Sequence, residues 1–88
     1  MSSNKNTLTQ DQMNVLRTNQ NRNQYRVNER LAAYNSASTI QDKNAILSTI
    51  SDLLCIQNKL WQITGYVPPG WQETQTSAEI QLGGKQHC

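Results

Sequence analysis

The sequence contains no phenylalanine, two cysteines and a single histidine among its 88 residues. Two cysteines are too few for a disulfide scaffold, so we expect a reduced chain in which Cys55 is a packed thiol. His87 and Cys88 are adjacent at the end of the chain and cannot complete the four-ligand set of a structural zinc site. The composition therefore predicts no metal site and no cofactor.

Long apolar runs are absent as well. No segment approaches the ~20 apolar residues that a membrane-spanning helix needs, so we expect no membrane span. Residues 1–6 are polar, and no apolar core of a signal peptide follows them. We therefore expect a cytoplasmic location, or a place within an assembly such as a virion, and no secretion by a classical signal.

The sequence also lacks a catalytic signature. Asp42 and Asp52 are about three helical turns apart in a predicted helix, which is too far for two carboxylates to share a proton. No serine stands beside a credible base. The Gly83-Gly84 pair is not followed by the helix that a phosphate-binding loop requires. We predict a protein that is not an enzyme, with no catalytic residue and no small-molecule substrate.

Amide side chains are abundant, with ten asparagines and eleven glutamines, while the net charge is only +2. Such a composition suits wet contacts with other chains, and it suits disorder equally well. A chain of this length forms one domain at most, whose core supplies only a few kcal/mol. These properties are typical of a part that docks onto a larger structure.

Two long segments carry the start and stop signals of helices. Thr9 begins a capping box with Gln12, and Ser38 begins a second one. Gly65 is a suitable residue for ending the second helix. The sequence therefore predicts a helical hairpin over residues 9–65, with helices at about 9–34 and 39–64.

The two predicted helices differ in polarity. The apolar stripe of the first has a polar centre made of Gln20, Asn23 and Gln24. The second carries an apolar face that is wider than a two-helix seam needs, and Ile56 and Ile63 extend that face to one side. We expect the excess to contact the tail or another molecule. The predicted partner-binding residues are Ile46, Ile50, Leu53, Leu54, Leu60, Trp61 and Trp71.

The ends of the chain are predicted to be irregular. Residues 1–8 form an extended arm, and residues 66–88 form a tail in which 78–82 can add one short strand. Trp61 is expected in the core, whereas Trp71 either covers it or anchors a partner. The fold class is mostly α, a two-helix antiparallel hairpin with an extended N-terminal arm and an irregular C-terminal tail. We expect oligomerisation or a partner to complete it.

Three arginines follow one another at helical spacing. Arg22, Arg26 and Arg30 make one basic stripe, and guanidinium groups pair well with phosphates. Neighbouring amides can read base edges. The alternative, which the small net charge favours, is a solvated face or a set of contacts to acidic groups of another protein.

The leading functional hypothesis is a non-enzymatic structural or interaction subunit of a larger assembly, which docks through the apolar face of the second helix. A minor virion component, such as a capsid cement or scaffold protein, is one concrete version. The first alternative is a small nucleic-acid-binding protein that uses the arginine stripe. The second is a soluble adaptor or inhibitor that fills the groove of a partner protein.

Overall fold

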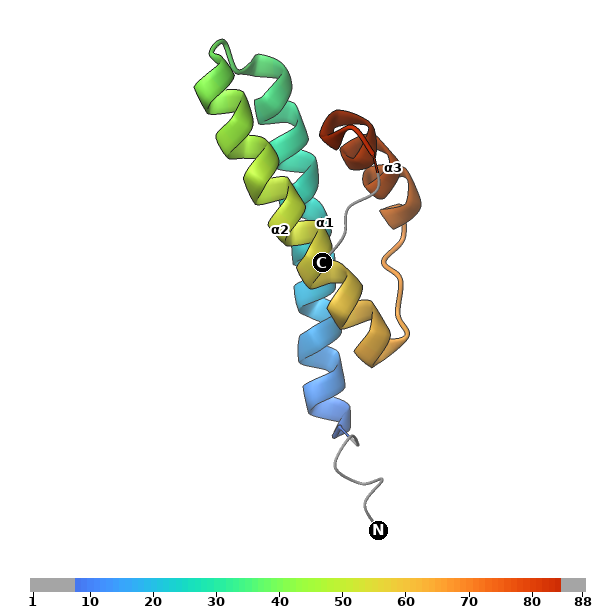
Figure 1. Cartoon of the computed structure of the whole chain (residues 1–88). Coiled ribbons are helices and arrows are strands. Elements are labelled where there is room, and N and C mark those ends of the chain that lie inside the picture. The colour runs from blue at the N-terminus through green and yellow to red at the C-terminus, as the bar shows by residue number, and fades with distance from the viewer. Residues whose placement is uncertain (1–7, 85–88) are drawn as a thin grey trace.

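The computed structural model describes residues 8–84, and in this part of the chain it is mostly helical and contains no strand. Its three helices are α1 (Gln10–Ser36), α2 (Ile40–Thr64) and α3 (Trp71–Leu82). The helices α1 and α2 form a long hairpin, and the short α3 lies along one side of it (Figure 1). The predicted helical class and hairpin are therefore present, but a third helix is added to them.

The start of α1 is a reciprocal cap. The Thr9 hydroxyl accepts a hydrogen bond from the Gln12 backbone N–H at 3.0 Å, and the Gln12 side-chain oxygen accepts one from the Thr9 N–H at 2.9 Å. These two bonds satisfy backbone donors that the first turn of a helix cannot pair. The predicted capping box is confirmed here.

The start of α2 is shifted by one residue from its prediction. Thr39, not Ser38, is the cap, and its hydroxyl accepts from the Asp42 N–H at 3.0 Å. Serine and threonine both suit the cap position of a helix. Contacts with the rest of the fold therefore decide that Thr39, and not Ser38, caps α2. In the observed register the Lys43 amine donates to the Tyr34 carbonyl at 2.9 Å and lies 4.4 Å from the Tyr34 ring centroid. This contact ties the first turn of α2 to the last turns of α1.

The end of α2 follows the prediction. Gly65 takes a left-handed conformation with φ of 69°, and its N–H donates to the Trp61 carbonyl at 2.7 Å. Glycine adopts this conformation without the steric penalty of a Cβ atom. The linker of residues 65–70 then turns the chain back toward α3.

The core is small. Its buried apolar side chains come from all three helices and are Val27, Ile50, Leu53, Leu54, Trp71 and Ala78. The placement of Trp61 in the core was wrong, because its side chain is 49% exposed. It belongs to the last turn of α2, which faces the linker. Trp71 is only 7% exposed, so this tryptophan packs within the chain.

The prediction of an irregular tail with a strand at 78–82 was wrong for the described residues. In α3, Ala78 is buried and Ile80 is 70% exposed, so the alternation that suggested a strand does not decide the structure. The inward positions are Trp71, Thr74 and Ala78, at spacings of three and four residues that bring side chains to one face of a helix. Small side chains at two of these positions hid the pattern.

Cys55 also departs from its prediction. It was expected as a reduced thiol packed in α2, but it is disulfide-bonded and only half-buried. His87, Cys88 and the predicted arm, apart from Leu8, lie outside the described residues. None of the described helices has the length and hydropathy needed to cross a membrane.

Candidate functional site

The polar centre of α1 is buried and joins all the elements together. Gln20 is fully buried, and its side-chain nitrogen donates to the Tyr66 carbonyl of the linker at 2.7 Å. Its side-chain oxygen accepts from the Thr64 hydroxyl at 2.7 Å. The Gln57 amide nitrogen donates to the Gln20 backbone carbonyl at 2.8 Å. Amides occupy the centre of the helix stripe because they bind backbone groups there, which leucine cannot do.

Further polar contacts from α1 hold the linker and α3 on one side of the hairpin. Gln24 donates through its amide nitrogen to the Pro69 carbonyl at 2.9 Å. The Tyr66 hydroxyl donates to the Asn21 side-chain oxygen at 3.1 Å, and the Thr74 hydroxyl donates to that of Asn28 at 3.0 Å. These contacts explain the side on which α3 packs.

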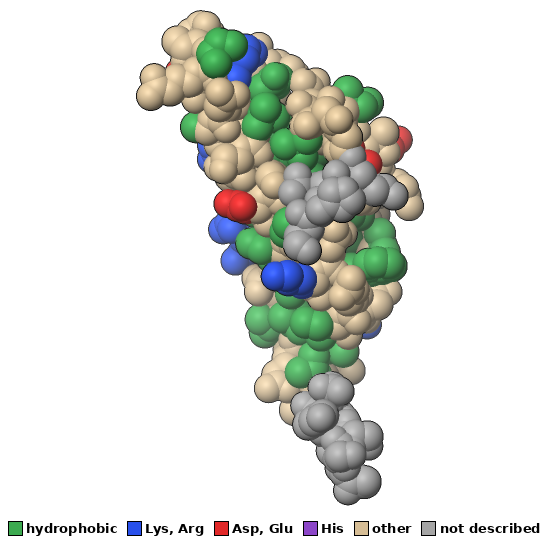
Figure 2. Space-filling view, in the orientation of Figure 1, with side chains coloured by type: hydrophobic (Ala, Val, Ile, Leu, Met, Phe, Trp, Pro, Cys, Tyr) green, Lys and Arg blue, Asp and Glu red, His purple; other side chains and the backbone are tan. Residues whose placement is uncertain are grey.

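The other side of α2 is not covered by α3. Asn58 and Trp61 line a cavity together with residues of α3, which places them on the α3 side of the helix. A helix turns by 100° per residue, so Ile56 and Ile63 lie about 150° around the helix axis from Asn58 and Trp61. Ile56 is 47% exposed and Ile63 is 56% exposed. Figure 2 shows hydrophobic side chains gathered over the C-terminal half of α2.

These isoleucines belong to a regular pattern, which we call the exposed seam. Along α2 its residues are spaced by four, three, four and three, and they are Thr49, Leu53, Ile56, Leu60 and Ile63. Of these, Thr49, Ile56 and Ile63 are exposed and Leu60 is half-buried, whereas Leu53 is buried and also belongs to the core. Alternating steps of three and four are the repeat by which one helix packs along another in a coiled coil. The seam therefore has the form of a helix-binding surface.

Two opposite charges border the exposed seam on one edge. Asp52 directly precedes Leu53 and Lys59 directly precedes Leu60, so both occupy the same position of the repeat. Both side chains are exposed, and within residues 8–84 neither forms a hydrogen bond or an ion pair. These groups are placed to contact a helix that lies on the seam.

The predicted partner-binding residues divide into three groups by exposure. Ile50, Leu53, Leu54 and Trp71 are buried inside the chain, whereas Ile46 and Leu60 are half-buried. Trp61 is exposed, but it lies on the α3 side. Sequence reasoning placed Ile56 and Ile63 at the margin of the apolar face and left them out of the predicted set. The spacing of four and three was the signal that identifies them.

The predicted arginine stripe runs along the outer surface of α1. Arg22, Arg26 and Arg30 are all exposed. In the part of the chain that the structure describes, none of the three forms an ion pair with an acidic side chain. Arg22 borders a shallow depression, whose other lining residues are Asn14, Val15, Thr18 and Asn19. The stripe is available to a charged partner.

Comparison with protein-family models, with curated proteins and with solved structures finds no match for this chain. In the described residues, no three or more His, Cys, Asp and Glu side chains form a group that could hold a metal ion. Within residues 8–84, the exposed seam and the arginine stripe are the two surfaces best suited to binding a partner.

Proposed function

We propose that this protein is a non-enzymatic structural subunit that pairs with a second copy of itself through the exposed seam. The observation that carries the proposal is the exposure of Ile56 and Ile63, at 47% and 56%, at equivalent positions of one repeat on α2. Exposed isoleucines at coiled-coil spacing gain about 25 cal/mol for each Å² that a second helix covers. The face of α2 that packs on α1 is already buried within each chain. Pairing through the seam would therefore bring two hairpins together as a bundle of four helices.

The charges beside the seam indicate that the partner is a second copy. An interface with two-fold symmetry must be complementary to itself. When two α2 helices run antiparallel with their crossing point at Ile56, Asp52 of each copy lies beside Lys59 of the other. Two ion pairs then form along one edge of the seam, each between Asp52 of one copy and Lys59 of the other. A parallel arrangement would instead set Asp52 beside Gln57 and Lys59 beside Thr64 of the other copy, and no ion pair would form.

The size of the chain agrees with pairing. Six apolar side chains are buried in the described core, and small single cores rarely supply more than about 3–5 kcal/mol. One partner's share of a standard interface is about 800 Å², which is roughly an eighth of the accessible surface of 6018 Å². One face of the hairpin is sufficient for such an interface. The pair would be the unit from which a larger assembly is built, of which a capsid cement or scaffold protein is one version.

A charge exchange tests the proposal. Asp52→Lys and Lys59→Asp each place like charges opposite one another, and each should weaken pairing by about fivefold to tenfold. The double variant Asp52→Lys/Lys59→Asp restores the complementary pattern and should recover pairing. Sedimentation velocity measures the three dissociation constants at low salt. A double variant that pairs no better than the single variants would contradict the antiparallel arrangement.

A matched pair of isoleucine variants tests the surface itself. Ile56→Asp puts a charge into the centre of the seam and should abolish pairing. Ile80→Asp makes the same change on α3 at a side chain that is 70% exposed, and it should leave pairing unchanged. Circular dichroism shows whether each variant keeps its helices. Equal effects of the two substitutions would exclude the seam as the interface.

The exposed arginine stripe supports a second candidate, binding of nucleic acid through phosphate contacts. Three contacts predict a fall in affinity with salt, with a slope of about −2.7 in log K against log salt on duplex DNA. The triple substitution of Arg22, Arg26 and Arg30 by glutamine should remove that slope. Fluorescence anisotropy with a labelled duplex measures it, and unchanged binding by the triple variant would reject this function.

A further inference from the structure

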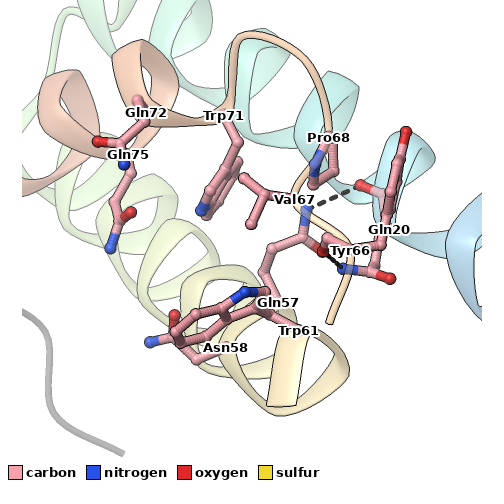
Figure 3. A pocket seen from close by; sticks show the side chains of 10 residues that line it. All are labelled: Gln20, Gln57, Asn58, Trp61, Tyr66, Val67, Pro68, Trp71, Gln72 and Gln75. Carbon is pink, nitrogen blue, oxygen red and sulfur yellow. Dashed lines mark hydrogen bonds between the residues drawn. The ribbon is translucent and has the colours of Figure 1, made fainter. Parts of the chain in front are cut away.

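One buried amide of α1 has no partner in its own chain. Asn23 is 7% exposed, yet within residues 8–84 its side chain neither donates nor accepts a hydrogen bond. Two other buried amides differ from it, because the Gln20 side chain donates to the Tyr66 carbonyl and the Gln57 side chain donates to the Gln20 carbonyl (Figure 3). An amide that is buried without a partner destabilises the fold. Asn23 is therefore suited to a partner outside the chain.

The amide of Asn23 is accessible from outside. Within residues 8–84, the Gln57 side-chain oxygen is the only completely enclosed side-chain nitrogen or oxygen that lacks a hydrogen bond. The unbonded amide atoms of Asn23 therefore keep some contact with solvent. Asn19, one helical turn earlier, is half-buried and also forms no side-chain hydrogen bond in the part of the chain that the structure describes. The two amides are a pair of available polar groups on α1.

These amides lie on the face of the hairpin that carries the exposed seam. Asn23 and Asn19 lie about 40° and 80° around α1 from Val27, which is buried in the core. Asn28 accepts a hydrogen bond from Thr74 of α3 at 3.0 Å. It lies about 100° from Val27 in the opposite sense. The two amides are therefore turned away from α3, as the seam is on α2.

Contacts within the hairpin show which level of α1 meets the proposed two-fold axis. The Gln57 amide nitrogen reaches the Gln20 carbonyl at 2.8 Å, so these two residues lie opposite one another. One step back along α2 is one step forward along α1, because the two helices run antiparallel (Figure 1). Ile56, where the axis crosses the seam, is therefore level with Asn21. In the bundle of four helices, this level of α1 faces the same level of α1 in the other copy.

We propose that the Asn19 side chain of each copy forms a hydrogen bond with the Asn23 side chain of the other, and that these two amide pairs set the register of the dimer. This inference rests on the pairing proposed above. Asn19 and Asn23 are each two residues from Asn21, so an antiparallel pair places Asn19 of one copy opposite Asn23 of the other. An amide both donates and accepts, as a self-complementary interface requires. A buried asparagine fixes the register and the number of chains of a coiled coil in the same way.

Isotope-filtered NMR spectra of an equal mixture of labelled and unlabelled full-length chain test this contact. Such spectra show only contacts between copies, so a cross-peak between the side-chain amides of Asn19 and Asn23 identifies the proposed pair. The Asn23 amide signals should also shift as the concentration rises and pairing increases. A chain that pairs without this cross-peak and shift would overturn the amide contact but not the pairing. A chain that stays single would overturn both.

The substitution Asn23→Leu separates register from affinity. Leucine removes the amide pair from an apolar centre, so the variant should pair at least as tightly, but in more than one arrangement. Sedimentation should show masses above two chains, or the filtered spectra should show more than one set of signals. Asn19→Leu should act in the same way, because it removes the other half of each pair.

Asn14→Leu is the matched control. Asn14 is exposed and lies about 180° around α1 from Asn23, so its substitution should change neither the mass nor the contacts. Circular dichroism shows whether each variant keeps its helices. A single closed pair with unchanged contacts in Asn23→Leu would overturn the role of the amides in setting the register.

Discussion

Replacing Gln20 by methionine tests whether the buried amides hold the three helices together. Methionine has nearly the same length and an unbranched chain, so the substitution leaves little empty volume. It removes the donor to the Tyr66 carbonyl and the acceptor of the Thr64 hydroxyl, both at 2.7 Å. The Thr64 hydroxyl keeps its bond to the Leu60 carbonyl at 3.1 Å. Within residues 8–84, no other side chain donates to the Tyr66 carbonyl, which therefore loses this bond.

The magnitude follows from these losses. Two hydrogen bonds contribute about 1 kcal/mol each, and a carbonyl left unpaired costs about 1 kcal/mol or more. Burial of the more apolar methionine side chain offsets about 1 kcal/mol of this. We expect a loss of about 2 kcal/mol in the free energy of unfolding, which corresponds to a fall of about 10 °C in the melting temperature for a chain of this size.

Urea unfolding followed by circular dichroism, at one fixed protein concentration, measures this change. Gln62→Met is the matched control, because Gln62 is exposed on α2 and should change stability by less than about 0.5 kcal/mol. If Gln20→Met were as stable as this control, the amides would not be the structural joint, and the reason given for the polar centre of α1 would be incorrect.

Three further substitutions test other parts of the structure by the same unfolding assay. Thr39→Ala should cost about 1 kcal/mol because the cap of α2 is lost, while Ser38→Ala should cost almost nothing; the reverse order would restore the cap that the sequence suggested. Gly65→Ala should cost about 1 kcal/mol from its φ of 69° alone, since nothing lies within 4 Å of the added Cβ atom; a neutral result would mean that α2 does not end in a left-handed residue. Trp71→Ala should cost about 3–5 kcal/mol and release α3, because this ring is 7% exposed within the core; retention of all the helical signal would show that α3 does not depend on it.

The hairpin was predictable because local signals determine it. Thr9 and Gln12 specify the start of α1, and Gly65 specifies the end of α2, through bonds between residues close in the sequence. Hydrophobic periodicity then orients α2 toward α1. These features need no knowledge of distant contacts.

The third helix was not predictable in the same way. Its first residue follows Gly70, which provides no side-chain cap, and its inward positions include Thr74 and Ala78 in place of large apolar residues. Its position depends on bonds from α1 more than 40 residues away in the sequence, such as that of Gln24 to Pro69. Polarity made the centre of α1 look unsuited to a core, although it is where the tertiary hydrogen bonds form.

The candidate surface was predicted only in outline. The excess of apolar side chains on α2 indicated an interface, but several of them, including Leu54 and Ile50, are buried within the chain. On the side of α2 away from α3, the margin of that face remains exposed at Ile56 and Ile63. Which part of a wide apolar face stays uncovered depends on where α3 packs, and the sequence alone did not place α3.

Sedimentation equilibrium of the unmodified chain over a hundredfold range of concentration is the most direct test of the central claim. Pairing through the exposed seam predicts a mass that rises with concentration to twice the 10.0 kDa of one chain and goes no higher, because a two-fold interface is closed. A mass that stays at that of a single chain throughout the range would contradict the account.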